Sequence, residues 1–311
     1  CIKVFLRKLF KITKLGIFMK ILIMGSEGFV GQNLVNGLSK NHDVFRSDQI
    51  DSNEKNYFKC NITNYDSVEK VVKDVDTVIH LTAHSLVSSL DGSITNAQVN
   101  IIGLLNLLEV CRKNSIPKVI FTSASSLIGE PSTFQVNEKH VPKPKTAYGI
   151  TKLTSEHYLR LYKELYNVDY TVFRFFNIYG PFQKNGLIPS IYKKIQNNEP
   201  ITIFGKGDQI RDYVYIEDII SFFEKSAVSK IGNDKILNMG TGTGTTILDI
   251  VKTMSQILEI EPKIEFQDPR PGEIGNFVSD TTVLKETFDN IPSTNVLDGL
   301  TKTIDWLKNY S

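Results

Sequence analysis

The sequence contains few cysteines, and they are scattered. Only Cys1, Cys60 and Cys111 occur among 311 residues, which is too few for a disulfide framework or a cysteine-rich metal site. A reducing compartment is therefore expected, and we predict a cytoplasmic protein. The histidines lack the spacing of metal ligands, so the sequence predicts no metal site.

Long apolar runs and a large excess of one charge are also absent. No apolar run reaches the ~18 residues that a membrane-spanning helix requires, so we predict no membrane span. The formal net charge is +2, and the first 18 residues contain five basic and no acidic residues (Lys3, Arg7, Lys8, Lys11 and Lys14). The rest of the chain has a slightly acidic balance, which gives no electrostatic case for a nucleic acid as partner.

Residues 1–18 are therefore considered separately. They mix apolar and basic side chains without sorting them onto two helix faces. One hypothesis is a weak interfacial helix on anionic lipid. The other, which we favour, is an upstream extension of little consequence. A signal peptide fits less well, because a strand follows at once and no small-residue cleavage site precedes it.

A glycine-bearing turn follows the first clear strand. Lys20–Met24 is a short apolar run, and Gly25, Gly28 and Gly31 come directly after it in a GxxGxxG spacing. Gly25 would allow a tight turn, Gly28 the approach of a pyrophosphate to helix N–H groups, and Gly31 close packing of helix on strand. A second strand, at 42–46, leads to Asp48, which would accept hydrogen bonds from an adenosine ribose and repel a 2′-phosphate. NAD is thus favoured over NADP, although Arg46 weakens that preference.

Strand and helix patterns alternate through the first half of the chain. Further strand patterns fall at 57–60, 77–81, 118–122 and 170–175, with a helical pattern at 96–113. This alternation predicts an α/β fold with a doubly wound parallel sheet and ligands at the carboxyl ends of its strands. After residue 180 the alternation loosens. We expect an N-terminal extension (1–18), an NAD-binding Rossmann domain (19–180) and a smaller C-terminal substrate lobe (181–311) with segments that return to the first domain.

Tyr148 and Lys152 form a candidate catalytic pair. Their i, i+4 spacing places both side chains on one face of a helix. A lysine ammonium beside a phenol favours the phenolate, so we expect the pKa of Tyr148 to be lowered and Tyr148 to act as a base toward a sugar hydroxyl. A hydroxyl-rich run, from Thr122 to Ser126, precedes the pair at the end of a predicted strand.

These motifs, taken in order, resemble a known family. Together with the glycine turn, the sequences HLTA (80–83), YGITK (148–152), RFFNIYGP (174–181), RDYVYIEDI (211–219), NMGTGTGTT (238–246) and RPGE (270–273) are similar to those of extended short-chain dehydrogenases/reductases of the NAD-dependent epimerase/dehydratase family. The most similar subgroup comprises the UDP-glucose 4-epimerase-like enzymes, which act on nucleotide sugars. The resemblance covers the chain from Met19 almost to its C-terminus.

The resemblance implies roles for individual residues. On the cofactor side it implies Gly25, Gly28, Phe29, Val30, Gly31, Asp48, Asn61, Ile62, Leu81, Thr82, Ala83, Asn100, Ser123, Tyr148, Lys152 and Phe176. On the substrate side it implies His84, Asn177, Ile203, Phe204, Arg211, Arg270 and Glu273, with the two arginines holding the diphosphate. It also implies a homodimer built on the helices at 96–113 and 148–165, with Leu104, Leu107, Leu108, Leu153, Tyr158 and Tyr162 among their apolar residues.

The sequence departs from the family pattern in the serine-rich run. The family usually has Ser or Thr five residues before Gly129, and that position is Ala124. We expect Ser126, and after it Ser125, to supply the hydroxyl. The 4,6-dehydratases have an Asp-Glu pair at positions 125 and 126, which the two serines cannot replace.

Three functions therefore stay open. The first is an NAD-dependent nucleotide-sugar 4-epimerase that works through a transient 4-keto intermediate. The second is an NAD(P)-dependent reductase of a 4-keto nucleotide sugar. The third is a non-catalytic NAD-binding relative.

Overall fold

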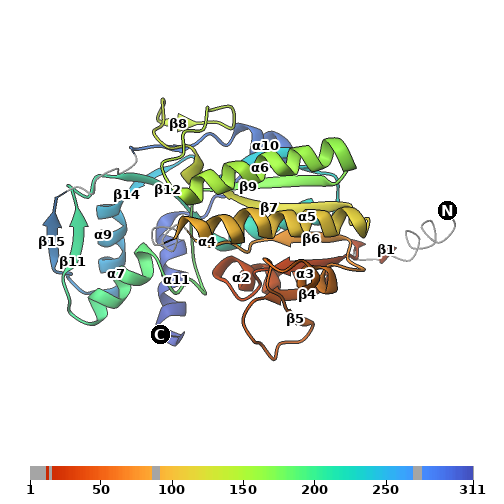
Figure 1. Cartoon of the computed structure of the whole chain (residues 1–311). Coiled ribbons are helices and arrows are strands. Elements are labelled where there is room, and N and C mark those ends of the chain that lie inside the picture. Colours follow the sequence, from red (N-terminus) through yellow and green to blue (C-terminus); the bar gives the residue numbers. More distant parts are fainter. Residues whose placement is uncertain (1–11, 14–15, 86–91, 269–274, 311) are drawn as a thin grey trace. The chain divides into compact units, whose positions relative to one another are not determined.

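The chain folds into two compact units that share its length unevenly (Figure 1). The computed structural model describes residues 12–13, 16–85, 92–268 and 275–310. The first unit comprises Cys1–Ser123, Thr146–Phe173 and Ile220–Ile236, and the second comprises Ala124–Lys145, Arg174–Ile219 and Leu237–Ser311. A segment after residue 180, Ile220–Ile236, belongs to the first unit, in line with the segments expected to return to it, whereas Ala124–Lys145 and the residues from Arg174 to 180 belong to the second unit.

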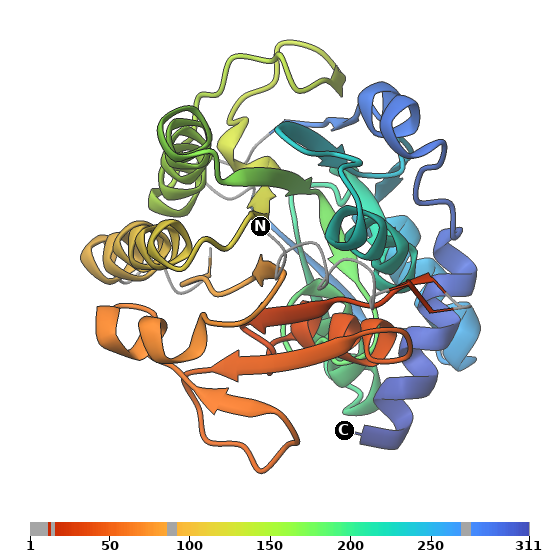
Figure 2. The same ribbon diagram turned by 90° about the vertical axis from the view of Figure 1, so that its right-hand side faces the viewer.

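A seven-stranded sheet forms the centre of the fold (Figure 2). Its order is β13-β9-β7-β6-β3-β4-β5, with bounds Lys20–Met24 (β3), Asp43–Asp48 (β4), Tyr57–Lys59 (β5), Thr77–His80 (β6), Lys118–Ala124 (β7), Asp169–Phe175 (β9) and Lys235–Met239 (β13). The pairs β5–β4, β4–β3, β3–β6 and β6–β7 are parallel. The chain runs outward from β3 to β5 and then returns to β6 on the other side of β3. The predicted doubly wound sheet is confirmed, and its strand order reverses between β3 and β6.

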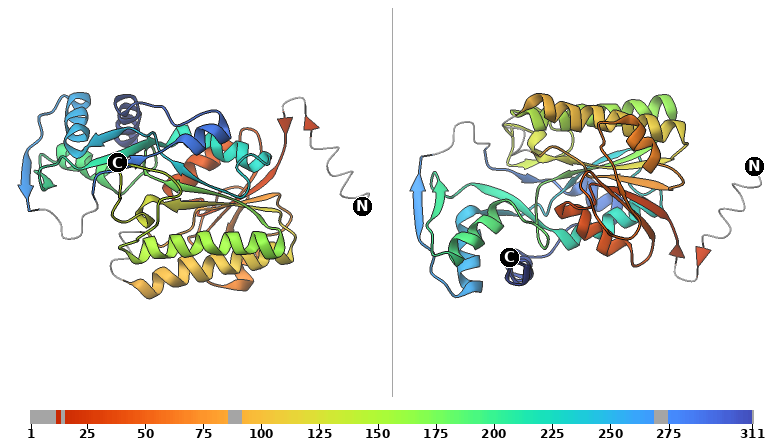
Figure 3. Two further views of the ribbon diagram at one scale, coloured as in Figure 1. Left: turned by 90° about the horizontal axis from the view of Figure 1, so that it is seen from above. Right: turned by 60° about the horizontal axis from the view of Figure 1, so that its bottom comes forward.

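Helices of the first unit cover the sheet. They are α2 (Phe29–Leu38), α3 (Tyr65–Val71), α4 (Ser93–Ala97), the π-helical turn η2 (Gln98–Ile102), α5 (Gly103–Lys113), α6 (Ala147–Tyr166) and α8 (Ile216–Val228), of which α8 extends across the division between the units. Figure 3 shows α5 and α6 side by side. Their buried side chains join those of the strands in one hydrophobic core. Burial of each large apolar side chain contributes about 1.5–3 kcal/mol, so this core is the main source of stability for the unit.

The core contains four of the six apolar residues named for the helices of the expected homodimer. Leu104, Leu107, Leu108 and Tyr162 are all buried in it. A partner subunit would therefore contact other residues of the two helices, and the homodimer stays a prediction.

The helix predicted at 96–113 is longer and less regular than expected. It begins at Ser93 and contains η2, whose wider turn holds Asn100. The whole segment Ser93–Lys113 is long and apolar enough to cross a membrane by length and composition. Its leucines lie in the core described above, and a buried core helix commonly has the same length and composition.

Part of the N-terminal extension is described. Ile12–Thr13 (β1) pairs antiparallel with Gly16–Ile17 (β2). The interfacial-helix hypothesis is therefore wrong for these four residues. The rest of the extension before Gly16 lies outside the described residues.

The second unit contains small sheets and several helices. Its sheets are β10-β12-β14 (Asn177–Tyr179, Ile210–Tyr215, Gly244–Thr246), β11-β15 (Ile201–Phe204, Ile264–Gln267) and β16-β8 (Val278–Ser279, Gln135–Val136). Its helices are the 3-10 turn η3 (Ser125–Leu127), α7 (Leu187–Gln196), α9 (Ile247–Leu258), α10 (Thr282–Phe288) and α11 (Val296–Tyr310). A capping box begins α9, since Thr246 and Asp249 each accept the other's backbone N–H.

The buried carboxylate of Asp212 connects three parts of this unit. It accepts hydrogen bonds from the backbone N–H groups of Thr241, Gly242 and Ser279 at 2.8, 3.0 and 3.0 Å. It also accepts from the hydroxyls of Thr241 and Ser279 at 2.7 and 2.6 Å. Five donors around one buried carboxylate fix β12, the 240–243 turn and β16 together.

Asp212→Asn tests this connection. The variant keeps the shape but turns one acceptor oxygen into a donor that faces other donors. We expect a loss of about 2–4 kcal/mol in the free energy of unfolding, measured by chemical denaturation. Asp280→Asn is the matched control, because Asp280 accepts only the exposed N–H of Thr282 among the recorded contacts and Asn accepts such a bond about as well. Equal stabilities for Asp212→Asn and its control would contradict this account.

Candidate active site

The glycine turn lies where the strand order reverses. Gly25 follows β3 with φ +86, and a Cβ there would come within 2.9 Å of the backbone nitrogen of Thr82, in the loop after β6. A Cβ at Gly31 would lie 2.2 Å from the carbonyl oxygen of Gly25. Both positions therefore require glycine for the fold itself, as predicted from their spacing.

Gly28 differs from its two neighbours. Its φ is −74, and an added Cβ would meet only the carbonyl oxygen of Gly25, at 3.4 Å. It is also the N-cap of α2, and no side chain caps that helix. The fold does not demand glycine here, whereas a pyrophosphate approaching the first turn of α2 would. The turn thus fits the dinucleotide that the sequence predicts, with Phe29, Val30 and Gly31 in the first turn of the helix.

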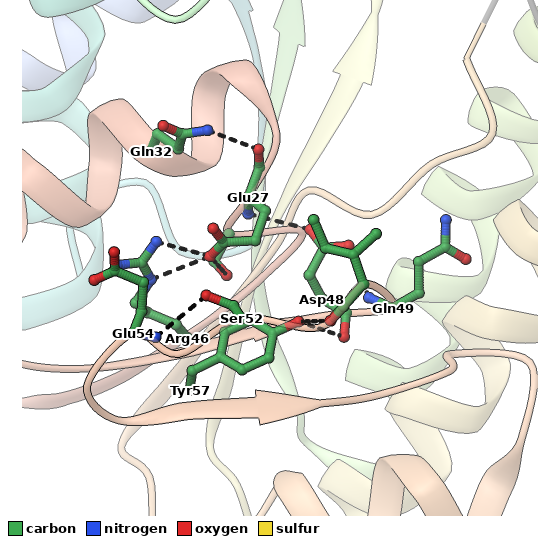
Figure 4. A network of polar contacts seen from close by, with 10 residues as sticks. Glu27, Gln32, Arg46, Asp48, Gln49, Ser52, Glu54 and Tyr57 are labelled. Atoms are coloured by element: carbon green, nitrogen blue, oxygen red, sulfur yellow. Dashed lines mark hydrogen bonds and ion pairs between the residues drawn. The ribbon is translucent and has the colours of Figure 1, made fainter.

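Asp48 ends β4, one strand from the turn. Its carboxylate accepts the backbone N–H of Glu27 at 3.1 Å and that of Gln49 at 2.7 Å (Figure 4). The predicted ribose acceptor is therefore joined to the glycine turn, and it is held by backbone groups, with no paired cation among the described residues. Asn61 uses its side-chain oxygen locally, for the N–H and hydroxyl of Thr63, while Ile62 is buried in the core.

A buried polar network braces the loop after β6. The side chain of Asn100 accepts the N–H of His84 at 2.7 Å and donates to the hydroxyl of Thr151 at 3.0 Å. The Thr151 hydroxyl in turn donates to Asn96 at 3.0 Å, and Asn96 donates to the carbonyl oxygen of His84. The network fixes the backbone of His84, the residue that follows HLTA, relative to the helix that carries Tyr148 and Lys152. The π-helical turn accounts for the placement of Asn100, since such turns widen a helix locally.

Lys152 is fully buried at the carboxyl end of β7. Its Nζ donates to the carbonyl oxygen of Thr122 at 2.7 Å and lies 4.6 Å from the ring centroid of Phe121. Burial lowers the pKa of this ammonium to about 7, against a smaller opposing effect of Glu156. Burial and the nearby Lys152 also lower the pKa of His80 to about 3, so His80 is a neutral core histidine.

The prediction for the pKa of Tyr148 is wrong for the protein alone. Burial raises the pKa of the phenol to about 12. The Lys152 Nζ lies 5.5 Å from the Tyr148 ring centroid, but its own charged form is disfavoured by burial. The expected lysine effect is therefore too weak to overcome the desolvation of the phenolate.

The serine-rich run spans the end of β7 and the turn η3. Ser123 is buried, and Ser125 and Ser126 are partly buried. The hydroxyls of Ser123 and Ser126 are buried without a hydrogen-bond partner among the described residues. Such groups are costly unless a ligand or water satisfies them, which favours these two serines as ligand contacts.

Of the predicted substrate residues that are described, His84 lies in the first unit, and Asn177, Ile203, Phe204 and Arg211 lie in the second. Ile203 and Phe204 line a cavity of about 590 Å³ together with Thr202, Gln209 and Gln267. Asn177 donates to the carbonyl oxygen of Asp212, and Phe176 is buried just before it. Arg211 precedes Asp212 on β12. The predicted Arg270 and Glu273 lie outside the described residues.

Three polar residues of the first unit were missed by the sequence analysis. Asn96 lies one turn before Asn100, and Thr151 lies within the YGITK motif, so their spacing on the two helices could have indicated the network. Glu27 lies between two of the motif glycines, Gly25 and Gly28, so its position in the motif could have indicated it. Within the described ranges, no group of three or more His, Cys, Asp and Glu side chains could hold a metal ion.

The sheet, its switch point and the glycine turn define the class of protein, a Rossmann-type dinucleotide-binding α/β protein. The model of the NAD dependent epimerase/dehydratase family matches residues 21–240. The chain belongs to this family, and the resemblance inferred from the motifs is confirmed.

Solved structures of similar proteins agree with this assignment. UDP-glucose 4-epimerase of Thermotoga maritima, solved with UDP-glucose, is 29% identical with a TM-score of 0.88, covering 94% of this chain and 99% of the other. UDP-N-acetylglucosamine 4-epimerase of Methanobrevibacter ruminantium M1 is 30% identical with a TM-score of 0.87 and the same coverage. UDP-glucuronic acid 4-epimerase of Bacillus cereus, solved with UDP-glucuronic acid and NAD, is 28% identical with a TM-score of 0.87, covering 94% and 100%.

The pKa of Lys152 predicts a pH dependence of stability in the nucleotide-free protein. The folded-state pKa of about 7 lies below the ~10.4 of an unfolded lysine, so between these values only the unfolded chain holds the proton. The free energy of unfolding should therefore rise with pH from 7 to 10, by at most about 1.4 kcal/mol per pH unit from this group. Lys152→Met should lack this contribution.

Comparing wild type with Lys152→Met isolates the contribution of Lys152 to the pH dependence of stability. Burial also lowers the pKa of Lys118, to about 8, which adds a slope of the same sign to both proteins. Urea denaturation at pH 7, 8, 9 and 10 gives the difference between wild type and Lys152→Met. If the difference in the free energy of unfolding between the two proteins stays constant over this range, the pKa of Lys152 is not lowered.

Proposed function

We propose that this protein is an NAD-dependent nucleotide-sugar 4-epimerase that works through a transient 4-keto sugar, with a UDP-sugar as substrate. The observation that carries the proposal is the Tyr148–Lys152 pair, anchored by the Lys152–Thr122 hydrogen bond at the carboxyl end of β7, in the same unit as an open glycine turn. The relatives described above, which act on UDP-sugars, support the choice of substrate class.

The proposed roles follow from the chemistry of each residue. When bound, NAD supplies a hydride acceptor and donor for carbon 4 of the sugar and a cationic nicotinamide. Tyr148 exchanges the proton of the 4-hydroxyl, and because a nearby positive charge favours the phenolate, it becomes an effective base only in the loaded enzyme. Lys152, held by Thr122, donates to the nicotinamide ribose. Gly28 and the first turn of α2 hold the pyrophosphate, and Asp48 the adenosine ribose.

Ser126 is the proposed hydroxyl contact of the sugar. Ala124 leaves the usual hydroxyl position of the family without a donor. The Ser126 hydroxyl is buried and unpartnered among the described residues, which suits a group that a ligand satisfies. The cavity that Ile203 and Phe204 line would hold the nucleotide, so that the sugar is free to turn between the two hydride transfers.

The epimerase differs from its alternatives in what it consumes. A 4,6-dehydratase requires an additional acid and base, which Ser125 and Ser126 do not provide. A reductase consumes one reduced dinucleotide for each product. An epimerase consumes none and returns the hydrogen of carbon 4 to the same sugar.

Tyr148→Phe and Ser126→Ala test the proposal with UDP-glucose, UDP-N-acetylglucosamine and UDP-glucuronic acid deuterated at carbon 4. Wild type should convert at least one of them to its 4-epimer with the label retained and no net change in NADH absorbance. Tyr148→Phe should lower kcat by about 10²–10⁴, the usual contribution of a general acid–base group. Ser126→Ala should lower kcat more than the control Ser125→Ala.

Each contrary outcome has a definite meaning. Unchanged turnover in Tyr148→Phe would exclude its proposed role. Stoichiometric consumption of NADH or NADPH would establish the reductase instead. Binding of NAD without conversion of any nucleotide sugar in a wider panel with GDP- and dTDP-sugars would favour the non-catalytic relative.

We further propose a homodimer formed through η2 and α6. Ile102, Ile150, Leu161 and Leu165 are exposed, and the last three share one face of α6 by their spacing. The double variant Ile150→Glu, Leu161→Glu should sediment as a monomer in sedimentation velocity, because the two substitutions place charge in an apolar contact. Leu297→Glu, which changes an equally exposed leucine on α11, should leave the mass unchanged. A monomeric wild type would refute this proposal.

A further inference from the structure

Arg46 lies on β4 with its guanidinium between two carboxylates (Figure 4). Its Nη2 and Nε donate to one carboxylate oxygen of Glu27 at 2.7 and 3.2 Å. Its Nη1 donates to Glu54 at 2.8 Å. The side chains of Arg46 and Glu27 are each only 14% exposed, whereas Glu54 is 58% exposed. The Glu27–Arg46 pair is thus shielded from solvent, whereas the contact of Arg46 with Glu54 is exposed to solvent.

The network adjoins the predicted ribose site. Glu27 belongs to the glycine turn, and its backbone N–H donates to the carboxylate of Asp48 at 3.1 Å. Two carboxylates, from Glu27 and Glu54, therefore contact the guanidinium, and a third, from Asp48, is joined to the same turn through the backbone of Glu27. Tyr57 lies close to these charges, since its hydroxyl donates to the carbonyl oxygen of Asp48, and its pKa is shifted by burial and by them. Burial raises the pKa of Tyr57 to about 12, with further contributions from Asp48, Glu27 and Asp51 that exceed the opposing one of Arg46.

We propose that Glu27, supported by Glu54, masks Arg46 and thereby makes the adenosine end of the site selective for a dinucleotide without a 2′-phosphate. This inference rests on the proposed use of NAD. Arginine is the side chain best suited to bind a phosphate, because its planar donors match the phosphate oxygens. Here those donors are already occupied by carboxylates. The 2′-phosphate of NADP, with a charge of about −1.5 to −2 at pH 7, would meet Asp48 and Glu27 without a free cation.

A purely structural role would have different consequences. An ion pair that only tethers the loop after β4 would change stability when broken, without a preference for either dinucleotide. The masking role predicts that neutralising Glu27 releases an arginine that can bind a phosphate. A change in nucleotide preference on neutralising Glu27 therefore indicates masking, whereas a change in stability alone indicates a structural role.

The experiment compares wild type, Glu27→Gln, Arg46→Ala and the double variant. Binding of NAD⁺ and NADP⁺ to the full chain, freed of bound dinucleotide, is measured by isothermal titration calorimetry. Glutamine keeps the size of the side chain and removes its charge. We expect Glu27→Gln to bind NADP⁺ about tenfold or more tightly than wild type does, with the affinity for NAD⁺ changed less than about threefold. The gain should be absent in the double variant, which lacks the guanidinium.

Asp51→Asn is the matched control. It removes one negative charge from the loop after β4, which also carries Glu54, but Asp51 is exposed and pairs with Lys59 rather than Arg46. We expect its affinity for NADP⁺ to change less than about twofold, because exposed charges are screened. The gain in Glu27→Gln should also shrink from pH 8 to pH 5.5, as the 2′-phosphate takes up a proton with a pKa near 6.

The outcomes distinguish this inference from the proposed function. If wild type binds NAD⁺ and Glu27→Gln gains no affinity for NADP⁺, the masking role is refuted and the epimerase proposal stands. An equal gain in Asp51→Asn, or a gain that survives in the double variant, also refutes masking, because the released guanidinium would not be the cause. If wild type binds neither dinucleotide, both the proposed function and the inference fail.

Discussion

The close approach of backbone to backbone at the glycine turn is the constraint on which the site depends. Gly31 allows α2 to begin against the carbonyl oxygen of Gly25, and Gly25 allows the turn to lie against the loop after β6. A side chain at Gly25 would push the turn away from the loop after β6, and one at Gly31 would push α2 away from the turn. Only because these contacts are made without side chains does Gly28 present an open helix N-terminus. Asp48 and the Glu27–Arg46 pair are then positioned by hydrogen bonds to the same turn.

A second polar system positions the chemistry. Asn96, Asn100 and Thr151 connect the loop after β6 to α6, and Lys152 connects α6 to the end of β7. The two systems meet at the loop after β6, which contacts the glycine turn on one side and the network on the other. The protein alone holds Tyr148 protonated and Lys152 partly neutral, because burial disfavours the charged form of both. Tyr148 is therefore expected to be a weak base until a bound group brings a positive charge close to it.

Much of the first unit could be predicted from the sequence, because its strands are short apolar runs separated by amphipathic helices. Lys20–Met24 agrees with the prediction at both ends, and the others agree to within a few residues. The motif spacing also predicted the glycine turn and the Tyr148–Lys152 helix. The pKa of Tyr148 was not predictable, since it depends on how deeply the phenol is buried, and no pattern of residue types encodes that depth. The π-helical turn at Asn100 and the pairing of Arg46 were missed for a similar reason, as both depend on partners distant in the sequence.

The interleaving of the two units limits how this fold can be rearranged. The second unit is assembled from three stretches of chain, and the first unit includes a short stretch, Ile220–Ile236, that lies between two of them. No single cut therefore yields either unit whole. A chimaera that aims to exchange sugar preference between relatives would have to transplant 124–145, 174–219 and the C-terminal stretch in concert, with all the new junctions in register. Recombination at one crossover would leave both halves incomplete, so changes of specificity in this architecture are expected to accumulate by substitution rather than by shuffling of modules.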